Sequence, residues 1–289
     1  MVKKQILRFP GDMSGNNRQK NGMDLIRSRR SVRSFDGKPL SEEEQESLLC
    51  FASSVETPYD LPITWRILDA KTHGLSSPVI TGTDLYMAGK MARSPHAEEA
   101  FGFAFERVVL FAVESGIGTT WIAGTMNRDA FERAMRLDAN EVMPCVSPLG
   151  HPAAKMSLRE SMMRKGVKAD TRLPFEELFF DSGFDTPLTA ERAGELADVL
   201  EMVRWAPSAV NKQPWRAVVC GDLVHFYEKQ SRGFVDASGW DLQKVDLGIA
   251  MCHFIYGMEE KNHRLEFLLT DPGLPHLSDT VYIASFRIQ

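Results

Sequence analysis

Four arginines lie within the seven residues RSRRSVR, from Arg27 to Arg33, with no acidic residue among them. A second basic segment, Lys155 to Arg172, holds six basic and two acidic residues. Each segment carries a formal charge of +4 in a chain of net charge −5, so the remaining sequence carries −13. Two basic segments in an acidic protein favour a site for one discrete anion over a broad nucleic-acid-binding face. A charge run can also be the solvated face of a helix, and this alternative stays open here.

A polar loop is predicted at PSAVNKQPW, Pro207 to Trp215. Pro207 and Pro214 restrict the backbone, while Ser208 and Asn211 offer short polar groups that could reach a ligand. An ordinary turn that hydrogen-bonds to itself would have a similar composition. The loop is therefore a candidate binding segment, and only its neighbours in the fold can indicate which ligand it would bind.

The elements that would position these segments follow from local patterns. SEEEQ predicts a helix start, with Ser41 as N-cap and Glu44 at the third helical position of a capping box. Apolar residues then recur with helical spacing, and the segment leads through two prolines into a strand-like WRIL. Further helices are expected over residues 101–113, ended by Gly116, and 242–256, ended by Gly257. Strands are expected in TTWIAG, EVMPCVSPLG, RLEFLLT and TVYIASFRI, with a hairpin turn at Gly221-Asp222.

The order of these elements repeats along the chain. The apolar positions of the helix that begins after Ser41 recur at an offset of 148 residues, and Trp65-Arg66 recurs as Trp215-Arg216 at an offset of 150. We therefore expect an α+β protein with two related halves, residues 1–180 and 181–289. Residue identity between the halves is low, so two unrelated domains with common periodicities remain an alternative. The first half alone has the arginines, and the second alone has the PSAVNKQPW loop.

Composition and motifs exclude several other classes. No apolar run reaches the ~18 residues of a membrane span, and the N-terminus lacks the pattern of a signal peptide. The four cysteines are far apart, which favours reduced thiols over disulfides or a zinc site, so we expect a soluble cytoplasmic protein without a metal. GIGTTW has Trp121 in place of the third glycine of a dinucleotide fingerprint. No separate dinucleotide-binding domain is predicted.

Taken in order, the motifs resemble those of the FMN-dependent nitroreductase family. The elements that carry the likeness are RRSVR at residues 29–33, GIGTTW at 116–121, GHP at 150–152 and PSAVNKQPW at 207–215. In a typical member the arginine element and the loop belong to one copy, and the flavin lies at a homodimer interface. Here they lie on different halves of one chain. The resemblance implies a nitroreductase fold whose two pseudo-symmetric halves mimic that homodimer, as in the duplicated branch of Thermotoga type, with one competent flavin site.

The resemblance also assigns candidate FMN-binding residues. Charge-assisted bonds to the phosphate would come from the arginine element and the second basic segment. A backbone N–H near Gly124 would face the flavin N5. The loop would complete the pocket. The residues implied are Arg29, Arg30, Ser31, Arg33, Ala123, Gly124, Lys168, Arg172, Pro207, Ser208, Ala209, Asn211 and Gln213.

The implied activity is hydride transfer from NAD(P)H through FMN to a nitroaromatic, a quinone or a similar acceptor. The flavin does the chemistry, so no catalytic side chain is required. Two alternatives stay open: a flavin-binding protein without turnover, for storage or sensing, and a diverged member that has lost flavin. Because both elements lie on one chain, we expect a monomer with no nucleic-acid or membrane partner.

Overall fold

The computed structural model describes residues 21–235, 239–276 and 278–289. The predicted lack of a signal peptide concerns residues 1–20, which lie outside this range. The described residues form two compact units. Unit 1 holds residues 21–26, 98–103 and 170–289, and unit 2 holds Arg27–Ala97 and Ala104–Ala169. These units do not follow the halves expected from the sequence, because residues 21–26, 98–103 and 170–180 pack with the C-terminal part.

The strands of unit 2 build a small antiparallel sheet, in which β2 (Leu85–Ala92) pairs with β1 (Thr64–Asp69), β3 (Glu141–Val142) and β4 (Val146–Leu149). Alternation along β1 places Leu68 in a core cluster with Phe131 of α5 (Arg128–Met135). Trp65 points to the other face and contacts Phe105 of α4 (Ala97–Glu114). Helices thus cover both faces of this sheet.

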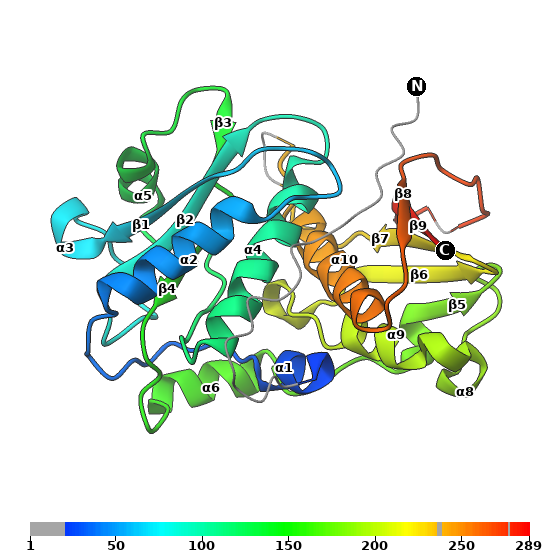
Figure 1. Cartoon of the computed structure of the whole chain (residues 1–289), viewed down its shortest axis with the longest axis horizontal. Helices are drawn as coiled ribbons and strands as arrows, with labels where there is room; N and C mark the ends of the chain where they lie inside the picture. Colours follow the sequence, from blue (N-terminus) through cyan, green and yellow to red (C-terminus); the bar gives the residue numbers. More distant parts are fainter. Residues whose placement is uncertain (1–20, 236–238, 277) are drawn as a thin grey trace. The chain divides into compact units, whose positions relative to one another are not determined.

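The remaining helices of unit 2 are α2 (Glu42–Ser54), α3 (Ala70–His73) and α6 (Leu158–Gly166) among the described residues. The predicted capping box of α2 is confirmed, since Ser41 accepts from the Glu44 amide and Glu44 accepts from that of Ser41. Phe51 of α2 stacks on Phe111 of α4 with ring centroids 4.2 Å apart. Figure 1 shows α2 running alongside β1.

Unit 1 contains a sheet with the strand order β5-β6-β7-β9-β8. β5 (Phe179–Asp181) runs parallel to β6 (Trp215–Cys220), and the other pairs, formed with β7 (Leu223–Lys229), β8 (Leu265–Leu268) and β9 (Thr280–Ile288), are antiparallel. The predicted hairpin turn is confirmed, because Cys220 pairs with Leu223 and Gly221 has a φ of 63°. The strand predictions RLEFLLT and TVYIASFRI are likewise confirmed as β8 and β9.

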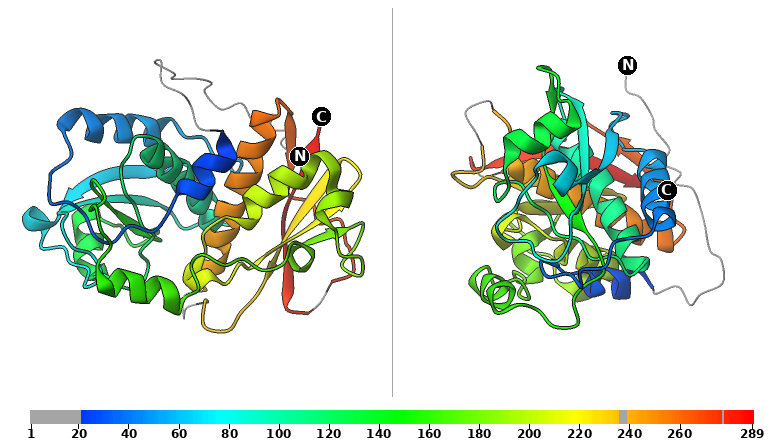
Figure 2. Two further views of the ribbon diagram at one scale, coloured as in Figure 1. Left: turned by 90° about the horizontal axis from the view of Figure 1, so that it is seen from below. Right: turned by 90° about the vertical axis from the view of Figure 1, so that its left-hand side faces the viewer.

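The long helix α10 (Leu242–Glu260) packs against this sheet (Figure 2). Phe254 of α10 contacts Phe226 of β7 and Phe286 of β9, so one aromatic cluster joins the helix to two strands. Beside α10 lies α9 (Ala197–Arg204). The chain also forms the short helices α1 (Gly22–Ser28), α7 (Phe175–Leu178) and α8 (Ala190–Ala193), and 3-10 turns at Gly194–Leu196 and Ala209–Asn211.

Two sequence predictions need correction. Helix α10 does not end at Gly257 but continues to Glu260. Gly257 lies inside the helix because α9 crosses there: a Cβ on this residue would lie 2.8 Å from the Met202 sulfur. The expected strand TTWIAG is present only as isolated bridges, in which Thr119 pairs with Ser31 and Ile122 with Val146.

No described helix combines the length and the apolar character needed to cross a membrane.

Candidate functional site

The arginine element of unit 2 runs beside GIGTTW. Ser31 forms a parallel bridge with Thr119, and the Val32 amide donates to the Thr119 carbonyl at 2.8 Å. Backbone pairing therefore fixes the segment that carries Arg29, Arg30 and Arg33.

Arg29 lies almost wholly inside the protein, with 8% of its side chain exposed. Its Nε is 3.8 Å from Oε1 of Glu106, a fully buried residue of α4 whose Oε2 accepts from the Trp121 indole at 3.0 Å. Burial lowers the pKa of the Arg29 guanidinium, while Glu106 opposes this shift. Among the described residues, the Arg29 Nε has no hydrogen-bond partner within normal distance. This buried donor is suited to an anionic ligand.

A second carboxylate enters the same cluster from α6. Glu160 is 1% exposed, and its Oε1 lies 3.8 Å from Nη1 of Arg30. Neither Glu160 oxygen has a hydrogen-bond partner among the described residues. Arg33 is partly buried, and burial lowers its pKa. Glu160 opposes this shift, and Arg164 of α6 adds to it. Arg164 also lowers the pKa of Arg29.

These six groups form what we call the arginine cluster: Arg29, Arg30, Arg33, Arg164, Glu106 and Glu160. Its four arginines and two carboxylates carry a formal charge of +2. A phosphate monoester carries about −1.5 to −2 at neutral pH, so one such group would neutralise the cluster. Sequence reasoning missed Glu106, Glu160 and Arg164. Glu106 did have a signal, since it is an acidic residue within the apolar run AFGFAFERVVLF.

The segment after GIGTTW is held by Arg128, whose Nη2 donates to the Ala123 carbonyl at 2.8 Å. Gly124 is exposed, and a Cβ built on it would meet no described atom within 4 Å. Both residues are in unit 2, as is Lys168, which is exposed and has a φ of 50°.

The PSAVNKQPW loop lies in unit 1, where it contacts the segment around Arg172. The Asn211 side chain donates to the Thr171 carbonyl at 3.1 Å, and the Leu173 amide donates to Oε1 of Gln213 at 2.9 Å. The Arg172 guanidinium donates to the carbonyl of Trp205 at 3.2 Å and lies 4.8 Å from the centre of its ring. The structure thus brings Arg172 together with the loop that follows α9.

Inside the loop, Ser208 Oγ accepts from the Gln213 amide at 2.9 Å, and the Gln213 side chain donates to the Asn211 carbonyl at 3.3 Å. Pro207 leads into this arrangement from the end of α9. The Ala209 amide donates to both carboxylate oxygens of Asp246, each at 3.1 Å. Asp246 is a further residue that sequence reasoning missed, although it is the one carboxylate within the apolar stretch VDLGIAMCHFIYGM of α10.

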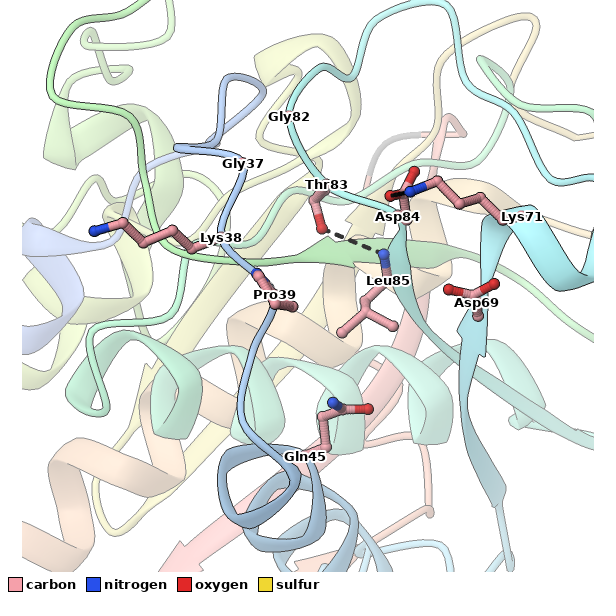
Figure 3. Close-up of a pocket in the computed structure, with 10 residues that line it drawn as sticks. All are labelled: Gly37, Lys38, Pro39, Gln45, Asp69, Lys71, Gly82, Thr83, Asp84 and Leu85. Atoms are coloured by element: carbon pink, nitrogen blue, oxygen red, sulfur yellow. Dashed lines mark hydrogen bonds and ion pairs between the residues drawn. The ribbon is translucent and has the colours of Figure 1, made fainter.

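A cavity of about 470 Å³ lies elsewhere in unit 2 and involves none of the predicted residues (Figure 3). Its charged groups largely satisfy one another: Lys71 pairs with Asp84 at 2.6 Å, and Asp69 caps α3 by accepting from the Thr72 amide. It therefore does not offer the excess positive charge of the arginine cluster. Within the described part of the chain, no group of three or more potential metal ligands is present.

Comparison with known proteins identifies a family that matches most of this chain. The sequence matches a family model described as "Putative TM nitroreductase" over residues 21–258. A crystal structure of a putative nitroreductase from Thermotoga maritima is similar, with 20% identity, a TM-score of 0.61, and coverage of 96% of this chain and 98% of that chain. No curated protein matches the sequence.

Two further solved structures cover about half of this chain. A putative NADH oxidase from Clostridium acetobutylicum has 22% identity and a TM-score of 0.40, over 46% of this chain and 90% of that chain. A putative NADH dehydrogenase/NAD(P)H nitroreductase from Bacteroides thetaiotaomicron has 21% identity and a TM-score of 0.41, over 48% and 90%. The likeness to the Thermotoga protein shows the shared fold, and the α+β class expected from the sequence is confirmed.

Proposed function

The chain belongs to the family described as putative TM nitroreductases, and from this premise we propose that it is an FMN-dependent oxidoreductase that uses NAD(P)H. The acceptor would be a nitroaromatic, a quinone or a similar small oxidised molecule. The family membership supports an oxidoreductase of nitroreductase type. The cofactor and the acceptor are the finer parts of the proposal.

The single observation that carries the cofactor assignment is the buried arginine cluster. It combines a formal charge of +2 with a buried Arg29 Nε that has no hydrogen-bond partner among the described residues. A phosphate oxygen at that donor would receive a charge-assisted bond, which is about twice as strong as a neutral one. The residues present therefore fit the phosphate of FMN.

The other candidate residues are proposed to bind the rest of the cofactor. Arg30 and Arg33 would favour the negative charge that develops on the flavin ring during reduction. Gly124 leaves room for close approach of a ring to the backbone. Ser31, Lys168 and Arg172, the backbone of Ala123, and the loop residues Pro207, Ser208, Ala209, Asn211 and Gln213 are proposed to complete the binding set.

When bound, FMN would supply the redox chemistry by accepting a hydride and passing electrons to the second substrate. The chain would supply charge and hydrogen bonds: Arg29 would hold the phosphate, and the Asn211 and Ser208 side chains would orient the cofactor. No side chain need act as an acid, a base or a nucleophile.

We also propose that the chain arose by internal duplication. The crossing of α4 and α10 supports this, because it is reciprocal. A Cβ on Gly102 of α4 would overlap the Val245 carbonyl oxygen of α10, and a Cβ on Gly248 would overlap that of Glu99. Gly102 follows Glu99 by three residues, and Gly248 follows Val245 by three, so the contact maps onto itself at an offset of 146. An isologous subunit interface has the same property.

A second candidate function is favoured by the carboxylates of the cluster. Glu106 and Glu160 already lie near Arg29 and Arg30, so the arginines have internal counter-charges. A diverged member that has lost flavin would have this arrangement as a purely structural ion-pair network. A member that binds FMN without turnover, for storage or sensing, is the intermediate case.

One experiment separates these functions. The purified protein is mixed with FMN, freed of unbound cofactor, and titrated anaerobically with NADH and with NADPH while its absorbance is recorded. Retained flavin absorbance that bleaches with either donor and returns on addition of a nitroaromatic or a quinone is the result expected for the enzyme. Retained absorbance that neither donor bleaches indicates a binding protein. Failure to retain flavin removes the proposed function.

A further inference from the structure

The PSAVNKQPW loop holds a backbone conformation that its residues would not adopt alone. Val210, Asn211 and Gln213 have φ angles of 44°, 58° and 52°. The left-handed region is particularly unfavourable for a β-branched residue such as Val210, which is also 60% exposed and gains little from packing. Such strain persists only where surrounding contacts fix the backbone.

The contacts within the loop close it on itself but do not attach it to the unit. The Asn211 amide donates to the Ser208 carbonyl, and the Lys212 amide donates to that of Ala209. The attachments come from outside the loop. Two of them lead to the neighbouring segment at Thr171 and Leu173. At the end of the loop, Arg216 donates to the Gln213 carbonyl and the Lys229 amide donates to that of Pro214. At its start, the Ala209 amide donates to Asp246 of helix α10.

Asp246 makes the deepest of these attachments. The residue is 3% exposed, and both of its carboxylate oxygens lie 3.1 Å from the Ala209 nitrogen. Ala209 directly precedes the left-handed residues Val210 and Asn211. The carboxylate thus fixes the backbone at the point where the strained conformation begins.

A carboxylate at this place is costly for folding. It lies inside a helix buried from Val245 to Ile255, where an apolar residue of similar size would avoid the desolvation penalty. The negative charges of Asp241 and Glu228 add repulsion to the cost of burial, and the pKa of Asp246 is raised well above its ordinary value. A further lysine and a further carboxylate, Lys244 and Glu99, act on Glu228.

The other half of the chain provides an internal comparison. With the offset of 146 that relates the α4 and α10 glycines, the position of Asp246 corresponds to Ala100 in α4. That half has TPYDLPITW where the second half has PSAVNKQPW. The buried carboxylate and the loop that it holds are therefore present together in one half and absent together from the other.

We propose that Asp246 is the positioning residue of the PSAVNKQPW loop: by accepting from the Ala209 amide, its carboxylate holds the loop in the left-handed conformation that presents Ser208 and Asn211 to the cofactor. The step from loop to cofactor rests on the proposed FMN function, whereas the hold on the loop does not. Asp246 itself would not touch the flavin.

The strength with which Asp246 holds the loop should depend on pH. The ionised carboxylate is the stronger acceptor for the Ala209 amide, and protonation replaces one of its oxygens by a hydroxyl. Because the pKa is raised, this change would occur above the pH range of an ordinary aspartate. The hold on the loop, and with it FMN affinity, should therefore weaken as pH falls through that raised pKa.

The test uses the full chain and two substitutions at Asp246. Asp246→Ala removes the acceptor, and Asp246→Asn keeps one neutral acceptor of the same size. Glu266→Gln is the matched control, because it removes the charge of another buried carboxyl of unit 1, on β8, which pairs with Arg287 and is not among the groups that shift the pKa of Asp246. Amide hydrogen exchange of residues 208–213 is measured without cofactor, and FMN dissociation constants are then measured across pH.

For Asp246→Ala we expect loop exchange about tenfold or more faster, and weaker FMN binding by a similar factor, because a hydrogen bond to a charged group is lost. Asp246→Asn should recover part of both effects and lose the pH dependence that distinguishes it from the native chain. Glu266→Gln should leave loop exchange unchanged.

The outcomes separate the two proposals. Unchanged loop exchange in Asp246→Ala would overturn the positioning role, whatever the flavin result. Faster exchange in a chain that binds no FMN would retain the positioning role and remove the proposed function. Equal changes in Asp246→Ala and Glu266→Gln would indicate general loosening of the unit and would also overturn the inference.

Discussion

Arg29 is the residue on which the proposed phosphate site depends most. Its guanidinium is buried near Glu106, and that carboxylate accepts a hydrogen bond from the Trp121 indole at 3.0 Å. Arg29→Ala therefore should not leave Glu106 without a hydrogen bond. We expect this substitution to weaken FMN binding about tenfold or more, since a charge-assisted bond is lost. Quenching of flavin fluorescence on titration with protein measures the effect.

Arg27 provides the control for this prediction. It belongs to the same run of arginines but is exposed, so Arg27→Ala removes the same charge from the surface. Its effect on FMN affinity should be smaller than about twofold at physiological salt, where surface charges are screened. Equal losses for Arg27→Ala and Arg29→Ala would mean that only the overall charge of the run matters.

Glu228 allows a prediction about stability. It is fully buried in unit 1, and burial together with the negative charge of Asp241 raises its pKa. The folded state then binds this proton more tightly than the unfolded state does. The free energy of unfolding should therefore fall as pH rises from the ordinary value of 4.5 towards the raised pKa.

Glu228→Gln should remove this part of the pH dependence and stabilise the chain at the alkaline end by roughly 1 kcal/mol or more. Urea unfolding of the native chain and the variant at several pH values measures it. Parallel stability profiles for the two proteins would show that Glu228 titrates normally.

At the level of elements, the crossing of α4 and α10 depends on two glycines. A methyl group at Gly102 or at Gly248 would overlap a carbonyl oxygen of the facing helix, and backbone cannot turn aside as a flexible side chain can. We expect Gly102→Ala and Gly248→Ala each to destabilise the chain by about 1–3 kcal/mol through overpacking. Chemical denaturation measures both.

Gly166 is the matched control, because it also lies in a helix, α6, and its Cβ would meet no described atom within 4 Å. Gly166→Ala should be neutral or slightly stabilising, since alanine favours helix by up to ~1 kcal/mol. If only one of the two crossing glycines proved sensitive, the reciprocal packing would lose its support.

The corresponding segments that lead into β1 and β6, residues 57–65 and 207–215, allow a second prediction about elements. Asn211→Ala removes the donor that holds the loop to the Thr171 carbonyl, and should lower FMN affinity by several-fold. Thr64→Ala changes an exposed residue at the start of β1, in the half that lacks the loop. It should leave FMN affinity unchanged. Similar losses for both variants would argue that each half has a working site.

The elements that local sequence predicts are those fixed by neighbouring residues. The Ser41 capping box and the Gly221 turn each depend on a few consecutive residues, and both are confirmed. The prediction that the helix ends at Gly257 is wrong, because this glycine makes room for α9. Such a contact between distant residues leaves no trace in the local periodicity. Partners such as Glu160 for Arg30 lie far apart in the chain and have no local signature.

At the scale of the whole molecule, the candidate residues are distributed over both units. Arg29, Arg30, Ser31, Arg33, Ala123, Gly124 and Lys168 lie in unit 2, and Arg172 and the loop residues lie in unit 1. Since one chain carries both sets, their effective concentration is high without a second molecule. The chain is therefore predicted to act as a monomer, whereas a family member with one set per copy would require a partner.

A single complete set of candidate residues implies that this chain by itself binds one FMN. The most direct test is calorimetric titration of cofactor-free protein with FMN, with light scattering on the same sample before and after. We expect saturation at one FMN per chain and the mass of a monomer, 32.5 kDa, in both states. Absence of binding, saturation at two FMN per chain, or a dimer that loses its flavin on dilution to monomer would contradict it.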